Sequence, residues 1–324
     1  MDTLYVVVPC YNEQEVLPET VKRLSEKLTT LIEAEKISPN SRMLFVNDGS
    51  KDETLDIINY FCDENPLVVG VDLSRNRGHQ SALLAGLAVA REYADMVISM
   101  DADLQDDINA IDGFIEKYYE GCEIVYGVRS DRTVDTAFKK KTAEGFYTVM
   151  QKLGVDIVYN HADYRLMSRR ALYALDNYKE VNLFLRGIVP LIGFKSGVVE
   201  YERSERFAGE SKYPLKKMLN FAVDGITSFS IKPIRFITFI GAAILALSIA
   251  VFVIGGIAKL CGANILRFYP LGCLISGMGA LELIAIGVVG EYVGKTYMES
   301  KRRPRFIIND VNAKNIVELE TNDQ

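Results

Sequence analysis

Two aspartates separated by one residue, Asp101 and Asp103, carry the sharpest chemical signal in this sequence, and Gln105 follows two positions later. Oxygen ligands of this kind suit a hard divalent cation, and Mg²⁺ or Mn²⁺ typically binds one or two carboxylates together with substrate phosphates. The alternative is a solvated acidic turn. We favour the metal site because the pair directly follows an apolar run, 96–100, that predicts a buried strand.

Three further polar clusters also follow short apolar runs. They are Pro9 with Tyr11, Asn12 and Glu13, then the segment 47–50 with Asp48, and then the segment 74–78 with Arg75. A single such cluster is usually only a turn. Because ligands bind beyond the carboxyl ends of strands in open α/β sheets, four clusters of this kind predict one binding site at one edge of a sheet.

The elements that must position these clusters alternate along the chain. Continuous apolar strands separated by helices predict an α/β fold with a mostly parallel sheet that is covered by helices on both faces. The expected strands are 4–8, 43–46, 67–73, 96–100 and 123–127, and the expected helices are 15–36, 52–64, 79–92 and 108–119.

The sequence lacks the motifs that are typical of several function classes. The chain has no G-x-G-x-x-G after the first strand, no P-loop motif and no G-x-S-x-G elbow. Its 2 histidines are too few for a typical zinc site, and its 5 cysteines, an odd number without a C-x-x-C pair, imply no disulfide framework. A formal net charge of -6 argues against nucleic acid as a partner.

Two long apolar runs, 236–258 and 268–290, set the second part of the chain apart, and only Glu282 interrupts them. Each is long enough to cross a bilayer as a helix, and the short connection between them predicts an antiparallel hairpin. The alternative is a helical hairpin inside a soluble core, which normally has a polar face. Glu282 is expected to face another helix or a second subunit, which would make a homo-oligomer through the hairpin.

Basic residues lie outside the hairpin, before 236 and in the stretch 295–305, whereas the loop holds only Lys259 and Arg267. The positive-inside rule then predicts a multi-pass protein of the plasma membrane with its N-terminal region and both termini in the cytoplasm. Apolar positions of the segment 215–229 fall on one helical face, which is typical of a helix in the membrane interface, although packing on the globular domain would give the same pattern.

The order of these motifs resembles one protein family. P-x-Y-N-E at 9–13, N-D-G-S-x-D at 47–52 and D-x-D at 101–103 are similar to the motifs of family 2 glycosyltransferases with a GT-A fold. The strings at 74–80, 101–105, 162–167 and 206–212, together with the hairpin, resemble the polyprenyl-phosphate glycosyltransferases within it, such as bactoprenol glucosyltransferases and dolichol-phosphate mannose synthases.

This resemblance implies four parts. A GT-A catalytic domain would cover 1–212, an amphipathic interfacial helix 213–231, a transmembrane hairpin 232–294, and a basic juxtamembrane segment with a C-terminal tail 295–324. It also implies an inverting, metal-dependent transfer of a sugar from a nucleotide donor to a membrane polyprenyl phosphate. The product would be a lipid-linked sugar donor for glycosylation of the cell envelope.

Site roles follow from the same resemblance. The nucleotide would be bound by Pro9, Tyr11, Glu13 and Asp48, which line the nucleoside pocket, together with Arg75 and Asp101. The metal would be bound by Asp101, Asp103 and Gln105, and the catalytic set would be Asp163, Asp103, Arg129 and Arg206. The donor or acceptor phosphates would contact Arg129, Arg206, Ser211 and Lys212. A carboxylate in the nucleoside pocket can accept from the uracil N–H, which favours UDP.

Asp163 matches a carboxylate usually described as the catalytic base. Because a phosphate monoester has a second pKa near 6, the acceptor is already largely ionised at neutral pH. Positioning the sugar and acceptor, or stabilising positive charge on the sugar ring, is therefore at least as reasonable a role, and the alternative is a structural partner for Arg165. Glucose is the first choice of sugar, ahead of N-acetylglucosamine, galactose, mannose and a modified pentose.

The sequence departs from the family pattern at two places, and two other functions are compatible with parts of the sequence. Asn47 stands where most relatives have aspartate, and Asp106-Asp107-Ile108 replaces a segment that usually contains proline.

A processive polysaccharide synthase is disfavoured because its Gln-x-x-Arg-Trp motif needs tryptophan and the chain has 0 Trp. A non-catalytic membrane anchor or lipid-binding module is disfavoured because both carboxylates of the pair are retained.

Overall fold

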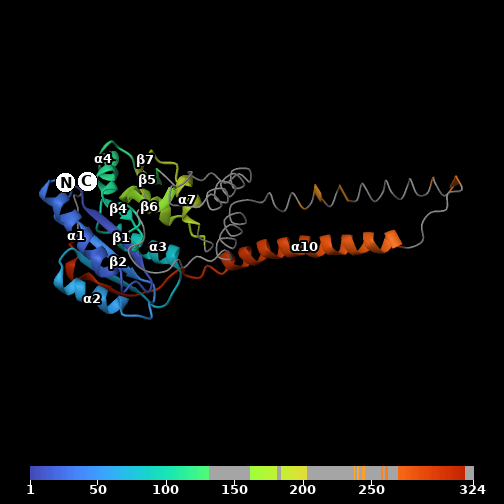
Figure 1. Cartoon of the computed structure of the whole chain (residues 1–324), viewed down its shortest axis with the longest axis horizontal. Coiled ribbons are helices and arrows are strands. Elements are labelled where there is room, and N and C mark those ends of the chain that lie inside the picture. The colour runs from blue at the N-terminus through green and yellow to red at the C-terminus, as the bar shows by residue number, and fades with distance from the viewer. Residues whose placement is uncertain are drawn as a thin grey trace.

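The computed structural model describes residues 1–130, 161–180, 184–202 and 269–317, and a few single positions between 237 and 261. Within these residues the chain builds one mixed sheet with helices on both faces, and one long helix extends away from it (Figure 1). The segment 131–160 and the expected interfacial helix 213–231 lie outside the described residues, as does most of the run 236–258.

Eight strands form the sheet in the order β7-β5-β6-β4-β1-β2-β3-β8. The four neighbouring strands β4, β1, β2 and β3 are parallel, as predicted, and β5 pairs with β7 in parallel. The mostly parallel sheet is nevertheless a mixed one, because β6 runs antiparallel between β4 and β5, and β8 runs antiparallel beside β3. The strands are β1 Leu4–Cys10, β2 Arg42–Asn47, β3 Val68–Leu73, β4 Met96–Ser99, β5 Ile124–Arg129, β6 His161–Ser168, β7 Ser196–Tyr201 and β8 Ile308–Asn312.

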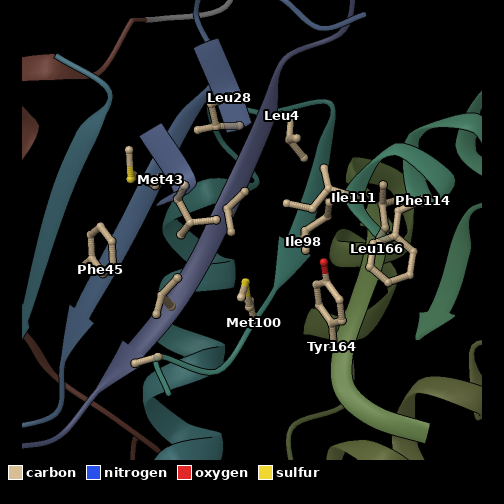
Figure 2. Close-up of a cluster of buried hydrophobic side chains, with 14 of the residues drawn as sticks. Leu4, Leu28, Met43, Phe45, Ile98, Met100, Ile111, Phe114, Tyr164 and Leu166 are labelled. Atoms are coloured by element: carbon tan, nitrogen blue, oxygen red, sulfur yellow. The ribbon is translucent and has the colours of Figure 1, made fainter. Parts of the chain in front are cut away.

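Side chains of one face of the sheet pack against α1 Leu17–Glu33, α2 Thr54–Glu64 and α4 Ala110–Tyr119. Figure 2 shows this core, in which Leu4 and Ile98 of the central strands meet Leu28 of α1 and Phe114 of α4. Val6 and Val8 follow Leu4 on this face, because alternate residues of a strand point the same way.

The other face is covered by α3 His79–Ala90, α6 Arg169–Asp176 and α7 Leu185–Leu191. Tyr5 and Val7 of β1 point to this side. Every residue of β1 and β2 is buried, so the strands read as continuous apolar runs rather than as alternating ones. The four helices expected from the sequence are all present, with bounds that differ by a few residues.

The C-terminal part of the described chain returns to the sheet, which the sequence pattern did not indicate. After α10, β8 pairs antiparallel with β3, and the short 3-10 helix Ala313–Asn315 follows. The side-chain amide of Asn315 donates to the carbonyl oxygens of Cys62 and Val68 at 2.7 and 2.9 Å. The segment 305–316 therefore belongs to the packing of the sheet domain.

Helix α10, Tyr269–Ser300, extends away from the sheet domain (Figure 1). It contains most of the second apolar run, 268–290, and many of its large apolar side chains are exposed, among them Leu271, Ile275, Ile284, Ile286 and Val293. Among the described residues, no helix has the length and apolar character needed to cross a membrane.

Candidate active site

The loops after β1 and β2 are held together by side chains that bond backbone amides. The N–H of Asn12 donates to Ser50 Oγ at 3.0 Å, and the N–H of Glu13 donates to Thr54 Oγ1 at 2.9 Å. Asn12 has a φ of 53°, in the left-handed region. The cluster of Pro9, Tyr11 and Glu13 thus has a defined shape beside the loop of Asp48.

Asp48 organises the loop after β3. Its two carboxylate oxygens accept from the backbone N–H groups of Arg77 and Gly78 at 2.7 and 2.9 Å, and the residue is 2% exposed. Burial raises the pKa of Asp48, although these two hydrogen bonds oppose that change. The loops come so close that a Cβ on Gly49 would lie 2.5 Å from the backbone nitrogen of Asn76. Arg75 is exposed on the same loop.

The asparagine at position 47 has a structural reason in this chain. Its amide nitrogen donates to Asp72 Oδ1 at 2.7 Å, and its oxygen accepts from the N–H of Ser50 at 3.1 Å. Asp72 also accepts from the side chain of Asn309 on β8. An aspartate at 47 would put two carboxylates in contact, so the amide is the side chain that matches Asp72 here.

The aspartate pair lies in a tight turn after β4. Asp103 Oδ1 accepts from the N–H of Gln105 at 3.3 Å, and Leu104 between them has a φ of 56°. Such a φ is uncommon for a leucine and costs conformational energy, which is characteristic of functional turns. Thr20 of α1 donates to the carbonyl of Ala102 at 3.0 Å, so the turn is also fixed from the side of the core.

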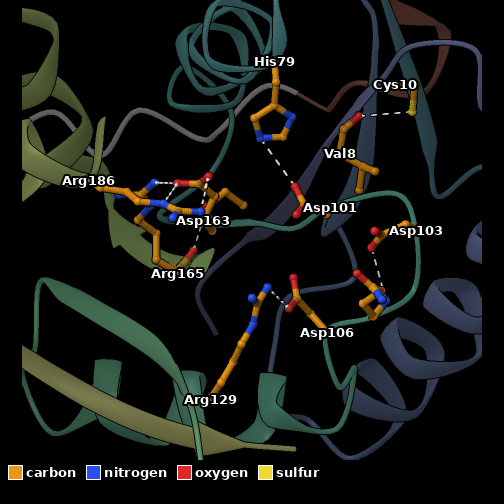
Figure 3. Close-up of polar contacts among 12 residues, drawn as sticks. Val8, Cys10, His79, Asp101, Asp103, Asp106, Arg129, Asp163, Arg165 and Arg186 are labelled. Atoms are coloured by element: carbon orange, nitrogen blue, oxygen red, sulfur yellow. Dashed lines mark hydrogen bonds and ion pairs between the residues drawn. The ribbon is translucent and has the colours of Figure 1, made fainter. Parts of the chain in front are cut away.

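Sheet register brings Asp163 to this turn. Ser99 of β4 is paired with Arg165 of β6 in an antiparallel ladder, so the residues just after β4 lie opposite those just before Arg165. The hydroxyl of Ser99 donates to the carbonyl of Asp163 at 2.5 Å. Asp101 and Asp163 are therefore neighbours although 62 positions separate them in the sequence, and Figure 3 shows both facing the same space.

Two guanidinium groups hold the carboxylate of Asp163. Arg165 Nη2 lies 2.8 Å from Oδ1, and Arg186 Nη2 lies 3.1 Å from Oδ2. Burial alone would raise the pKa of Asp163, but Arg186 and Arg165 outweigh it and hold that pKa well below its usual range. Asp163 therefore pairs with Arg165, as the alternative interpretation predicted, and it also lies beside the aspartate turn.

His79, the first residue of α3, approaches the aspartate pair from the opposite side. Its Nε2 lies 3.4 Å from Asp101 Oδ1, and both side chains are about one-third exposed. Burial raises the pKa of Asp101, His79 lowers it, and the carboxylates of Asp163 and Asp103 raise it again, so that it lies above the ordinary value. A group of carboxylates with this mutual repulsion is one that a cation would stabilise.

Arg129 ends β5 on the remaining side of the space. Its Nη2 lies 3.6 Å from Asp106 Oδ1, and its Nε donates to the hydroxyl of Tyr201 at 3.3 Å. Burial and the nearby Asp101 carboxylate raise the pKa of Asp106, Arg129 and the hydrogen bond from Tyr201 lower it, and the net result is a pKa of about 6. Asp106 belongs to the unusual segment after Gln105.

The residues at the turn suit a divalent cation with oxygen ligands. Asp101 and Asp103 offer carboxylates and Gln105 an amide oxygen, which is the chemistry that Mg²⁺ and Mn²⁺ prefer. In the described part of the chain, no group of three or more His, Cys, Asp or Glu side chains is arranged to hold a metal. Mg²⁺ sites with one or two carboxylates are completed by waters and substrate phosphates.

The structure thus brings Asp103, Asp163 and Arg129 of the predicted catalytic set together with Asp101 of the predicted metal set. Arg206, Ser211 and Lys212 lie outside the described residues. Sequence reasoning missed the role of Arg186, which sits in an ordinary apolar context, F-L-R-G, without a chemical signal. Gln80 could have pointed to it, because its side chain accepts from the N–H of Leu185 at 2.9 Å and holds the start of α7.

Comparison with known proteins finds relatives over most of the chain. The family model described as "Glycosyl transferase family 2" matches residues 5–176. The chain is 53% identical to "Uncharacterized glycosyltransferase YkoT" of Bacillus subtilis (strain 168) over 94% of this chain and 91% of the relative. It is 42% identical to "Bactoprenol glucosyl transferase" of Shigella phage SfV over 94% of this chain and 97% of that protein. The structure of mannosyl-3-phosphoglycerate synthase from Rubrobacter xylanophilus is similar with a TM-score of 0.47 and 14% identity, covering 83% of this chain and 78% of that one.

Proposed function

The chain belongs to glycosyl transferase family 2 and is a glycosyltransferase, and we propose that it transfers a hexose from a UDP-sugar to a membrane polyprenyl phosphate with inversion at the anomeric carbon. The observation that carries this proposal is the meeting of Asp101 and Asp103 with Asp163 and Arg129 at one edge of the sheet. Glucose is the favoured hexose, in line with the name of the phage relative.

On the donor side, the loops after β1 and β2 would hold the nucleoside through Pro9, Tyr11, Glu13 and Asp48, with Arg75 near the nucleotide. Asp48 shapes this pocket by fixing the loop of Arg77 and Gly78. Asp101, Asp103 and Gln105 would hold Mg²⁺ or Mn²⁺. When bound there, the cation would supply Lewis-acid stabilisation to the leaving diphosphate.

Asp163 would act as a fixed negative charge rather than as a proton acceptor. Two guanidiniums keep it ionised, and a carboxylate with so low a pKa is a poor base. The acceptor phosphate also needs little deprotonation at neutral pH. Asp163 would therefore stabilise the positive charge that develops on the sugar ring and orient the sugar toward the acceptor.

The acceptor phosphate needs cations on the side away from the nucleoside. Arg129 is 25% exposed at the end of β5, and we propose that it contacts this phosphate. Arg206, Ser211 and Lys212 would complete the phosphate sites. Arginine suits the task because its planar fork can bind two phosphate oxygens at once.

We place the enzyme at the plasma membrane as a multi-pass protein with a cytoplasmic catalytic domain, 1–212. The interfacial helix 213–231 and the hairpin 232–294 would bring the site to headgroup height, and the basic segment after 294 would stay on the cytoplasmic side. Exposed apolar side chains on α10 support burial of that helix in lipid or against a second copy of the chain. Extraction of membranes at alkaline pH tests the anchoring, and cross-linking tests the oligomer.

The decisive experiment incubates membranes that contain the full chain with labelled nucleotide sugars and polyprenyl phosphate, and follows the label into organic solvent. We expect product with UDP-glucose, loss of product with a chelator, and recovery with Mg²⁺ or Mn²⁺. A different sugar in the product would correct only the donor. No lipid-linked product from any nucleotide sugar would refute the function and favour a binding module.

Asp103→Ala is expected to lower the initial rate at least about a hundredfold, because the diphosphate loses the stabilisation that the cation supplies. Asp107→Asn is a matched control, since Asp107 is a nearby carboxylate whose side chain only accepts from the N–H of Asn109. Full activity of Asp103→Ala would contradict the metal site.

A further inference from the structure

A buried tyrosine and a buried aspartate lie directly behind Arg129. Tyr201 is 4% exposed and Asp106 is 3% exposed, whereas the side chain of Arg129 is 25% exposed. We propose that Tyr201 and Asp106 are positioning residues that fix the guanidinium of Arg129 for the phosphate of the lipid acceptor. This inference rests on the proposed function, because it concerns the acceptor site of that reaction.

The hydroxyl of Tyr201 makes two contacts that fix its own direction and that of Arg129. It donates to Asp106 Oδ1 and accepts from Arg129 Nε, which is 3.3 Å away. The same Oδ1 of Asp106 lies 3.6 Å from Arg129 Nη2. The aspartate therefore orients the tyrosine hydroxyl and attracts the guanidinium, while the hydroxyl defines the rotation of the arginine side chain (Figure 3 shows Asp106 and Arg129).

The sheet delivers Tyr201 to this place. Arg129 and Tyr201 are register partners at the ends of the parallel strands β5 and β7. Beyond them, the backbone N–H and the hydroxyl of Ser130 both donate to the carbonyl of Tyr201, at 3.0 and 3.1 Å. A Cβ on Gly127 would lie 3.1 Å from Cε1 of Tyr201, so the glycine leaves room for the ring to lie over β5.

An aromatic cluster holds the tyrosine ring and the aspartate loop together. The Tyr164 ring meets Tyr201 edge to face at 5.3 Å and Phe114 at 4.7 Å. The hydroxyl of Tyr164 donates to the carbonyl of Asp107 at 3.0 Å. Tyr164 also follows Asp163 directly in the chain. One buried cluster thus ties the turn that carries Asp101 and Asp103 to the strand end that carries Arg129.

The physical gain is preorganisation. An arginine side chain loses rotamer entropy when it is immobilised, and that loss weakens phosphate binding unless the free protein already holds the side chain. Because Tyr201 and Asp106 are buried, they cannot reach a phosphate in the open space themselves. Their effect on the acceptor must pass through Arg129, and this dependence is what an experiment can detect.

The test measures binding of farnesyl phosphate to the detergent-solubilised full chain by calorimetry, for the wild type, Tyr201→Phe, Arg129→Ala and the double variant. Tyr201→Phe keeps the ring and removes the hydroxyl, so we expect about tenfold weaker binding with an unchanged affinity for UDP. In the Arg129→Ala background, the second substitution should change the affinity less than twofold, because the arginine it positions is gone. Asp106→Asn should also weaken acceptor binding, and Tyr173→Phe, at an exposed tyrosine whose hydroxyl contacts Glu92, is the control.

The outcomes separate the two proposals. Unchanged acceptor binding in Tyr201→Phe, an additive double variant, or an equal loss of UDP and acceptor affinity would overturn the positioning role, even if the wild type makes the lipid-linked sugar. A coupled pair of substitutions in a protein that forms no lipid-linked product from any donor would support the positioning role and refute the proposed reaction. If the wild type did not bind farnesyl phosphate, the positioning role at the acceptor site would be overturned, whereas the proposed reaction is judged by product formation alone.

Discussion

At the scale of single residues, the balance of charge around Asp163 decides its chemistry. Arg165 is 2% exposed and would be a buried, uncompensated cation without this carboxylate. Arg186 reaches the same carboxylate from a different element, and its side chain is 31% exposed. Asp163 is therefore both a structural partner and a charged group facing the site, and the two roles do not exclude one another.

Asp163→Asn is expected to lower the free energy of unfolding by about 3 kcal/mol at pH 7, because it leaves the Arg165 charge unpaired. The folded-state pKa of Asp163 is lowered, so its stabilisation is fully present above the unfolded-state pKa, about 3.9, and is lost as the pH falls toward the folded-state pKa. The difference in the free energy of unfolding between wild type and variant should therefore shrink as the pH falls below about 4. Urea unfolding at pH 7 and pH 3 measures it.

Asp176→Asn is the matched control, since Asp176 also pairs with two cations, Arg91 and Lys179, but is 44% exposed. Exposed pairs contribute little, so its effect should stay below about 1 kcal/mol. A loss in Asp163→Asn that is the same at both pH values would contradict the charge argument.

At the scale of elements, α3 links the core to the site. Its first residue, His79, faces Asp101, and its middle packs on β1 and β2 without room for a side chain at Gly86. A Cβ there would lie 2.4 Å from Val7 Cγ1 and 2.7 Å from Val46 Cγ2. The close packing of α3 on the sheet determines where His79 lies relative to the aspartate turn.

Gly86→Ala is therefore expected to destabilise the protein by about 1–3 kcal/mol through overpacking, although alanine favours helix by up to about 1 kcal/mol. The midpoint of urea unfolding measures the change. Gly294→Ala in α10, where a Cβ meets nothing within 4 Å, should show no loss. If Gly86→Ala were as stable as the wild type, the contact between α3 and the sheet would have to be looser than described.

At the scale of the whole molecule, the chain beyond α10 closes onto the sheet beside β3. The carbonyl of Ile307 accepts from the N–H of Ser74 at 3.0 Å, at the start of the loop that carries Arg75. Arg42 Nε donates to the carbonyl of Asn315 at 2.7 Å, and Arg42 is 8% exposed. The end of α10 and the loop of Arg75 are thus joined through one strand.

Asn315→Ala is expected to cost about 1–3 kcal/mol, because the carbonyls of Cys62 in α2 and Val68 in β3 lose their donor. The melting temperature of the full chain in detergent measures this. Lys314→Ala removes an exposed pair with Asp63 and should leave the melting temperature unchanged. Equal melting of Asn315→Ala and wild type would mean that the C-terminal segment does not contribute to the sheet domain.

Local patterns in the sequence were sufficient for much of this protein. The expected strands and helices up to residue 129 are present because hydrophobic periodicity and strand-end turns are properties of neighbouring residues. The same reasoning located Asp101 and Asp103 at the end of β4, and the order of the motifs identified the family.

Tertiary structure alone decided how these pieces meet. The antiparallel insertion of β6 between β4 and β5 sets Asp163 beside Asp101, and the return of β8 attaches the segment after α10 to β3. Arg186 and Tyr201 carry no local signal, since their partners Asp163 and Arg129 lie 23 and 72 positions away. The residues of a strand determine which side chains share a face, but the neighbouring strand and the register depend on packing across the whole sheet. That pairing and register brought the site residues together.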